Sequence, residues 1–501
     1  MTLAERTITA AAWNYAGTAA RIIGQLIAQI LLARMVGPQA FGLVAVAILP
    51  LLFSCLIVDL GLGSALIQCN NPTQDDIKAV WSRTTFTGLV VTLVLCFSSH
   101  PMSVLLGNPQ AESVIRWLAP VALLHGLTVA PLAMLRRQLD MKRIQFAQLS
   151  AYLSGFMGVG VISAWSGAEV WALVAAWLTF YIISFVMLLY FSKLRLSLGS
   201  PFQGANYLKA FARSIMFTNL FNWTVENLDN LAIGKFFGAQ ALGLYSISYN
   251  LTRTPANHIV ASLQAALFPA SARMQDDVEN LRRGYLAVVS AISLLAIPVF
   301  LSMAAVSHTL VLALFGDKWQ GAEAVVAPLA LAMIFHVIMA VSGPILAGKG
   351  NPEIEFRVQL WSGLLFIGLL MWASRSSVIV IAWGVFVIYM VRMVWMTTAL
   401  LKKLQIECIS LIGILSRSFF FGFAISCAVL GCDIYFSRLL LPSFQLVFDA
   451  IVALSSMLCL LLMAPTTFIS IDLQRMISRL SFQNSLLRTL KIFRKNKECH
   501  Q

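Results

Sequence analysis

The chain has 501 residues, of which 59% are hydrophobic and only 11% are charged, and its formal net charge is +14. A soluble domain carries about a quarter charged residues, so this composition, with a mean hydropathy of +0.82, excludes soluble enzymes, disordered chains and collagen-like or disulfide-scaffold proteins. The apolar stretches are long enough for spanning helices of about 20 residues, whereas an outer-membrane barrel shows short alternating strands, so we expect an all-α polytopic membrane protein.

Apolar stretches along the chain predict about 14 transmembrane helices. In chain order these are 9–33, 41–67, 80–99, 114–135, 144–165, 169–191, 210–234, 241–269, 284–304, 323–347, 358–374, 377–400, 410–432 and 446–468. Counted from a cytoplasmic N-terminus, most lysines and arginines outside these spans fall in the inner loops and the C-terminal tail. This positive-inside bias predicts that both termini are cytoplasmic. The basic charge is then explained by topology, so no nucleic-acid partner is expected.

A short motif occurs twice at an offset of 201 residues. Residues 37–43 read GPQAFGL and residues 238–244 read GAQALGL, with five of seven positions identical. A second match follows in the same order, LGN at 106–108 and FGD at 315–317. We infer a duplicated six-helix unit, and because six is even the two repeats are parallel rather than inverted.

The repeat predicts how the chain is organised. We expect an N-terminal six-helix lobe at 1–191, a cytoplasmic linker at 192–209 and a C-terminal six-helix lobe at 210–400. Two extra transmembrane helices follow at 401–470, then a basic amphipathic cytoplasmic tail at 471–501. That tail suits either a position on the inner leaflet or a frayed basic end.

Polar side chains inside the predicted spans are the candidate functional residues, because a charged group at the bilayer centre costs about 2.5–3.5 kcal/mol on insertion scales. The first span places five of them on one helical face, namely Asn14, Thr18, Arg21, Gln25 and Gln29. The seventh span does the same with Asn219, Asn222, Glu226, Asp229 and Asn230. The offset of 201 aligns the two faces, so we expect them to line a water-filled cavity between the lobes.

The eighth span adds polar residues at every fourth position, Tyr245, Tyr249, Arg253 and Asn257. We predict that Arg21 and Arg253 bind an anionic substrate. The side chains expected to assist them are Gln25, Gln29, Asn222, Tyr249 and Asn257. The alternative is structural: each arginine pairs with a carboxylate or carbonyl, or extends to an interface.

Three carboxylates are candidates for binding a coupling ion, Na⁺ or H⁺: Glu226, Asp229 and Asp59. Glu226 and Asp229 equally suit plain ion pairing, and Asp59 suits an interfacial position. No catalytic or metal-binding motif stands out, so we expect neither an enzyme nor a resident metal or cofactor. His336 is interpreted as a packing residue, and Arg392 as a residue that extends to the inner interface.

Several short segments match a known family in their order along the chain. They are TITAAAW at 7–13, LAR at 32–34 with FGL at 41–43, DLG at 59–61, LFPA at 267–270 with QDD at 275–277, and FGDKW at 315–319. In these segments the chain resembles bacterial polysaccharide transporters. It is more closely similar to Wzx-type flippases of the colanic-acid exporter branch, within the multidrug/oligosaccharidyl-lipid/polysaccharide exporter superfamily.

The resemblance implies two lobes in a V shape that open alternately to each side of the bacterial inner membrane. The implied cargo is a polyprenyl-pyrophosphate-linked oligosaccharide, moved from the inner to the outer leaflet for exopolysaccharide, capsule or O-antigen assembly. By the same resemblance, Arg21 and Arg253 meet the anionic head group, and the last two helices form a lipid-tail groove. Membrane lipids and polysaccharide polymerase machinery are the implied partners.

Two rival functions stay open. A multidrug and toxin antiporter for organic cations belongs to the same superfamily, but its cavity is dominated by carboxylates, which Arg21 disfavours. A membrane glycan polymerase belongs to a different class and usually carries a large outer loop, whereas the loops predicted here are short.

Overall fold

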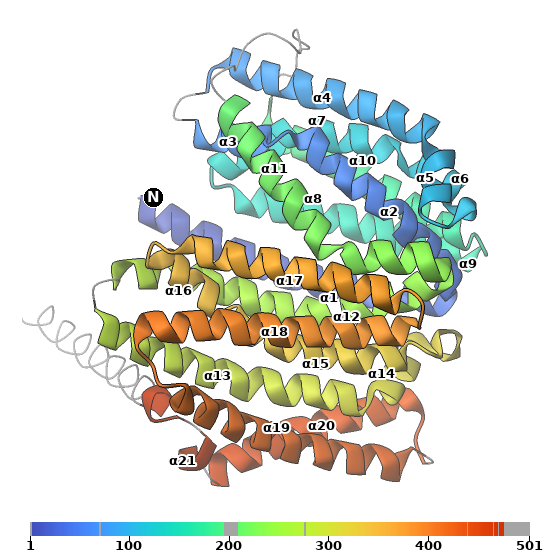
Figure 1. Cartoon of the computed structure of the whole chain (residues 1–501). Helices are drawn as coiled ribbons and strands as arrows, with labels where there is room; N and C mark the ends of the chain where they lie inside the picture. The colour runs from blue at the N-terminus through green and yellow to red at the C-terminus, as the bar shows by residue number, and fades with distance from the viewer. Residues whose placement is uncertain are drawn as a thin grey trace, which may run out of the picture. The chain divides into compact units, whose positions relative to one another are not determined.

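The computed structural model describes residues 3–69, 72–194, 209–274, 277–437, 439–463, 465–468 and 470–474, and the regular elements in these ranges are helices (Figure 1). Within them, 12 candidate spans are long and apolar enough to cross a membrane. The prediction of an all-α polytopic membrane protein is therefore confirmed. Most of the predicted linker (192–209) and of the basic tail (471–501) lies outside the described residues.

The seventh and eighth predicted spans (210–234 and 241–269) are also helical, but they are not among the 12 candidate spans of the described residues. The seventh covers α11 (Lys209–Glu226) and the start of α12 (Leu228–Arg273), so Asp229 and Asn230 lie in α12, and the eighth lies in the rest of α12. Gly238 interrupts α12 with φ 82° and ψ 178°, a backbone conformation that glycine adopts without a steric penalty. Polar and charged side chains along both helices lower their hydropathy, and this explains why apolar length alone does not select them.

The described chain forms two compact units. The first extends to Ser246 and includes Leu314–Trp319, and the second comprises Ile247–Ala313 and the chain from Gln320 onward. The boundary therefore falls inside α12, and the first unit contains both copies of the repeated motif.

The first unit contains the helices of the N-terminal half. They are α1 (Leu3–Met35), α2 (Pro38–Asp59), α3 (Leu62–Gln68), α4 (Gln74–Phe97), α5 (Ser99–Leu105), η1 (Pro109–Ala111), α6 (Glu112–Leu118), α7 (Pro120–Arg137), α8 (Met141–Tyr152), the π-helical η2 (Leu153–Gly160), α9 (Val161–Trp165), α10 (Val170–Ser192), α11 and the start of α12. α4 lies against α7, α7 against α10, and α1 against α8 (Figure 1).

Small residues and hydroxyls hold these helices together. A Cβ atom on Gly126 of α7 would lie 2.3 Å from the carbonyl oxygen of Thr84 on α4. In return, the Thr84 hydroxyl donates a hydrogen bond of 2.9 Å to the carbonyl oxygen of Gly126. Close approach at small residues, completed by an interhelical hydrogen bond, is typical of helix packing in membranes.

The second unit contains the later helices. They are the rest of α12, α13 (Val278–Ala305), most of α14 (Ser307–Phe315), α15 (Glu323–Met339), α16 (Ser342–Gly348), α17 (Pro352–Ala373), α18 (Val378–Leu404), α19 (Cys408–Phe436), α20 (Pro442–Met463) and α21 (Pro465–Phe468). α13 contacts α15 and α19, and α15 contacts α18 (Figure 1).

The first of the two extra helices, α19, is part of the core of this unit. Ser418 lies 2.9 Å from Ser293 of α13, hydroxyl to hydroxyl, and Ser426 lies 3.3 Å from Ser302. Phe421, between these two polar contacts, is fully buried. α20 packs on α19 and leaves many large apolar side chains exposed, as a lipid-facing helix does.

Candidate functional site

The two copies of the repeated motif lie against each other within the first unit. One copy begins α2, and the other begins the part of α12 that follows Gly238. A Cβ atom on Gly42 would lie 1.6 Å from the carbonyl oxygen of Ala239, and a Cβ atom on Gly243 would lie 2.0 Å from the carbonyl oxygen of Pro38. The contacts are reciprocal, so each glycine lets the backbone of the other copy touch its own helix.

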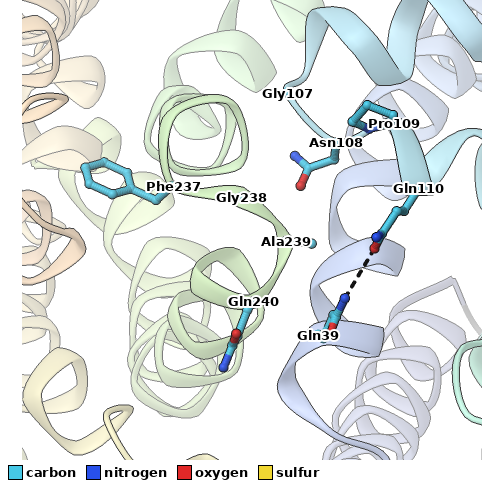
Figure 2. A pocket seen from close by; sticks show the side chains of 9 residues that line it. All are labelled: Gln39, Gly107, Asn108, Pro109, Gln110, Phe237, Gly238, Ala239 and Gln240. Carbon is cyan, nitrogen blue, oxygen red and sulfur yellow. Dashed lines mark hydrogen bonds between the residues drawn. The ribbon is translucent and has the colours of Figure 1, made fainter.

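A pocket of about 500 Å³ lies beside this contact (Figure 2). Its lining residues are Gln39, Gly107, Asn108, Pro109, Gln110, Phe237, Gly238, Ala239 and Gln240. The Gln39 amide donates a hydrogen bond of 3.2 Å to Gln110. Asn108 donates 2.7 Å hydrogen bonds to the carbonyl oxygens of Leu106 and Gly234, which joins the 105–110 loop to α12. The pocket is lined by amides and carries no charged side chain.

The segment 315–319, which contains the second repeated match, also belongs to the first unit and contacts the end of α1. Trp319 is fully buried, and its indole N–H donates a hydrogen bond of 2.8 Å to the carbonyl oxygen of Ala33 at the end of α1. Its ring meets Phe41 edge-on, with the ring centroids 5.4 Å apart. Lys318 donates to the carbonyl oxygen of Met35 at 3.0 Å. The Trp319 segment therefore satisfies backbone acceptors at the C-terminal end of α1 that the helix leaves open.

The polar face of α1 meets polar side chains of α8. Gln145 donates a hydrogen bond of 2.8 Å to the side-chain oxygen of Asn14, and Arg21 donates to the side-chain oxygen of Gln148. Gly17 makes room, because a Cβ atom there would lie 2.4 Å from the Gln145 side chain. Sequence reasoning missed Gln145 and Gln148, although their spacing of three already placed two amides on one face of the fifth span.

The rest of this face is partly accessible. Arg21, Gln25 and Gln29 are all half-buried, as is Thr18. The described contact of the Arg21 guanidinium is thus with an amide, which leaves its positive charge unneutralised. A cation held by an amide on a half-buried helical face suits an anionic ligand.

The carboxylate of Asp229 is buried and accepts several hydrogen bonds. The Tyr245 hydroxyl donates to it at 2.6 Å, and the backbone N–H of Asn230 donates at 2.8 Å. Glu226, three residues earlier, is exposed, and Asn222 is half-buried. The structure thus gives Asp229 a structural role within the first unit.

Asp59 stands where α2 ends and α3 begins. Its carboxylate accepts a hydrogen bond of 3.2 Å from the backbone N–H of Gly63 in the first turn of α3. Leu60 and Gly61 between the two helices have positive φ angles of 52° and 68°. An acidic side chain is favourable at a helix N-terminus, so Asp59 stabilises this break in the second predicted span.

Arg253 lies in the second unit with the aromatic ring of Tyr249. The guanidinium carbon lies 5.2 Å from the centroid of the ring, one helical turn away. Tyr249 is buried and Asn257, on the following turn, is exposed. A guanidinium over an aromatic face is stabilised without losing its charge, so the Tyr249 ring stabilises Arg253 in its cationic form.

Comparison with known proteins identifies relatives over most of the chain. A sequence profile of the family described as "Polysaccharide biosynthesis protein" matches residues 31–324. Lipopolysaccharide biosynthesis protein WzxC of Escherichia coli (strain K12) is 26% identical over 380 residues, which cover 73% of this chain and 75% of that protein. Teichuronic acid biosynthesis protein TuaB of Bacillus subtilis (strain 168) is 26% identical over 417 residues, covering 80% and 84%.

The fold also matches a solved structure. The lipid II flippase MurJ, in its inward closed conformation, superposes with a TM-score of 0.71 at 11% identity, over 90% of this chain and 98% of that chain. At this identity the similarity is one of fold.

Proposed function

The chain belongs to the polysaccharide biosynthesis protein family, and from that premise we propose that it moves a polyprenyl-pyrophosphate-linked oligosaccharide across the bacterial inner membrane. It is a membrane transporter rather than an enzyme. The proposed direction is from the inner to the outer leaflet, for exopolysaccharide, capsule or O-antigen assembly. The observation that supports this most is a helix, α1, whose polar face carries one arginine among amides.

The physical need for such a face comes from the sugar. Moving an unpaired hydroxyl into hydrocarbon costs roughly 1–7 kcal/mol depending on the reference state, so a repeat unit with many hydroxyls cannot cross lipid unaided. Amides on a half-buried face replace hydrogen bonds that water would otherwise make. The lipid tail stays in the bilayer, because exposing it costs about 0.8 kcal/mol per CH₂. A path open sideways to lipid meets both demands.

We place the transport path and its residues as follows. The chain has about fourteen spans, as two parallel six-helix repeats and two additional helices, with α11 and α12 as the least apolar members and both termini in the cytoplasm. The lobes alternate in access to the two leaflets. Arg21 and Arg253 bind the head group. The side chains that bind the adjoining part of the substrate are Gln25, Gln29, Asn222, Tyr249 and Asn257. Three carboxylates are proposed to bind the coupling ion, and Glu226 is the first candidate among them because it is the exposed one.

A deletion strain tests the function. We expect lipid-linked oligosaccharide to accumulate on the inner leaflet and surface polysaccharide to be lost, with recovery when the wild-type chain is supplied. Arg21→Ala and Arg253→Ala should fail to restore export at normal protein level. Arg417→Ala is the matched control, because Arg417 is an exposed arginine of α19. Normal surface polysaccharide in the deletion strain would contradict the function, whereas normal export by both variants would contradict only the head-group assignment.

A further inference from the structure

The last two transmembrane helices contact each other through polar side chains. α20 packs along α19 (Figure 1) and exposes many of its large apolar side chains. The buried residues that the structure describes in α20 are both polar, Gln445 with 3% of its surface exposed and Asp449 with 2%. They are four residues apart and therefore share one helical face. Near its start, α20 thus buries polar side chains where a helix usually buries apolar ones.

Gln445 holds the carboxylate of Asp433 on α19. Its side-chain amide donates a hydrogen bond of 2.6 Å to a carboxylate oxygen of Asp433, and one of 2.8 Å to the backbone carbonyl oxygen of the same residue. Three residues further along each helix, the rings of Phe436 and Phe448 pack together with their centroids 4.9 Å apart. A hydrogen-bond donor favours the charged form of a carboxylate, so Asp433 is suited to remain ionised and to accept.

Asp449 lacks such a donor. Its side chain is buried, and in the described part of the chain neither of its carboxylate oxygens has a hydrogen-bond partner. The titratable groups that face it are Asp433 and Cys432 of α19, and a thiol is only a weak donor. The short α21 also packs on α20, but none of its four residues is ionisable. An ionised carboxylate enclosed in this way, beside a second carboxylate, is unfavourable on both counts.

We infer that Asp433 and Asp449 form a proton-binding site that joins α20 to α19. The proton binds to a carboxylate oxygen of Asp449, and the resulting hydroxyl donates a hydrogen bond to the carboxylate of Asp433. The pair then carries one negative charge instead of two. Asp433 is half-buried, so the site can exchange its proton with the surroundings. This inference goes beyond the proposed function and does not depend on which substrate is moved.

A metal ion suits this site less well than a proton. Within the ranges that the structure describes, no group of three or more histidine, cysteine or acidic side chains is arranged to hold one. The amide of Gln445 presents its N–H group, and not its oxygen, to Asp433. A proton needs only the two carboxyl groups, because the protonated one supplies the donor that both of them lack.

Thermal unfolding of the purified full chain at different pH values tests whether the folded chain holds this proton. When the folded state binds a proton that the unfolded state releases, stability falls as the pH rises. We expect the melting temperature of the wild type to fall by several degrees from mildly acidic to mildly alkaline pH. Asp449→Asn should fall much less, because its amide replaces the protonated carboxyl. Asp75→Asn is the matched control, since it removes an exposed carboxylate of α4, and it should follow the wild type.

Infrared spectroscopy then locates the proton. A protonated carboxyl group has a C=O stretching band that a carboxylate does not show, and we expect Asp449→Asn to lose a band that Asp75→Asn keeps. Asp433→Asn replaces the second charge by an amide donor, so in this variant the band should disappear at a lower pH than in the wild type. If Asp449→Asn does not fold, the shift in Asp433→Asn decides by itself.

Three results would overturn the site. One is the same pH dependence of unfolding in Asp449→Asn and in the wild type. Another is a carboxyl band that is unchanged both in Asp449→Asn and in Asp433→Asn. The third is stabilisation of the wild type, but not of Asp449→Asn, by Na⁺ at constant pH, because the ligand would then be a metal cation.

Discussion

The two copies of the repeated motif (37–43 and 238–244) agree closely in sequence where they contact each other, whereas the polar faces aligned by the same offset do not. At the motif contact the two copies keep five of seven residues, and Gly42 and Gly243 touch the backbone of the other copy reciprocally. On the polar faces the offset of 201 pairs residues that all differ: Thr18 with Asn219, Arg21 with Asn222, Gln25 with Glu226, and Gln29 with Asn230. Identity is kept where two backbones must touch. The sequences differ on the two polar faces, which are the faces proposed to bind the ligand.

The largest expected effect is at the glycine contact. Gly42→Ala and Gly243→Ala each place a methyl carbon far closer to a backbone oxygen than van der Waals contact allows, so the helices must move apart. Overpacking a tight contact lowers the free energy of unfolding by about 1–3 kcal/mol and occasionally more. We expect each variant to lose stability at or above the top of that range. Thermal unfolding of the purified protein measures the loss.

Gly37→Ala is the matched control for this prediction. Gly37 precedes α2 in the same motif, but a Cβ atom there would have nothing within 4 Å, and its φ of −84° is open to any residue. Equal stability of Gly42→Ala and Gly37→Ala would show that the motif copies do not depend on backbone contact.

A second test exchanges residues between the polar faces. Arg21→Asn gives α1 the residue that α11 carries at the aligned position, and we expect export to fall more than tenfold because the head group loses its cation. Adding Asn222→Arg should not restore export, since the faces are not interchangeable. Surface polysaccharide and protein level are measured together. Full recovery in the double variant would show that only the total charge matters.

A third, smaller effect is expected at Gln148. Gln148→Leu removes the acceptor that holds the Arg21 guanidinium, and hydrogen bonds to charged groups contribute about 1.5–3 kcal/mol. We expect a several-fold loss of export with modest loss of thermal stability. Gln148→Glu keeps an acceptor but neutralises the arginine, so it should retain stability and still lose export. Wild-type export in Gln148→Glu would contradict a head-group role for Arg21.

The smallest effect is expected at the amides of the pocket. Gln39 and Gln240 occupy the same place in both motif copies, yet both are exposed, and the hydrogen bond that Gln39 donates to Gln110 is long, at 3.2 Å. Surface substitutions of this kind usually stay within about 0.5 kcal/mol, so Gln39→Ala with Gln240→Ala should leave melting temperature and export unchanged. A clear loss of export would contradict this view, because the shared glutamines of the two motif copies would then serve transport as well as packing.

Much of the fold and part of the site follow from single segments. Long apolar stretches correctly predicted an all-α polytopic membrane protein, and the ordered motifs predicted the family that the profile match confirms. The roles of Arg21, Arg253 and their assisting residues remain predictions. The sequence could not reveal Gln148 as the partner of Arg21, because 127 residues separate them.

By itself the sequence determined a helical membrane protein with a motif repeated at an offset of 201 residues and polar residues inside predicted spans, because hydropathy, charge and repetition belong to segments taken one at a time. Only the tertiary structure decided that the two motif copies pack against each other at glycine, and that the amides of α8 complete the polar face of α1. Such contacts depend on how each helix is rotated and how closely it approaches its neighbours, and a periodicity along one helix does not specify the helix that faces it.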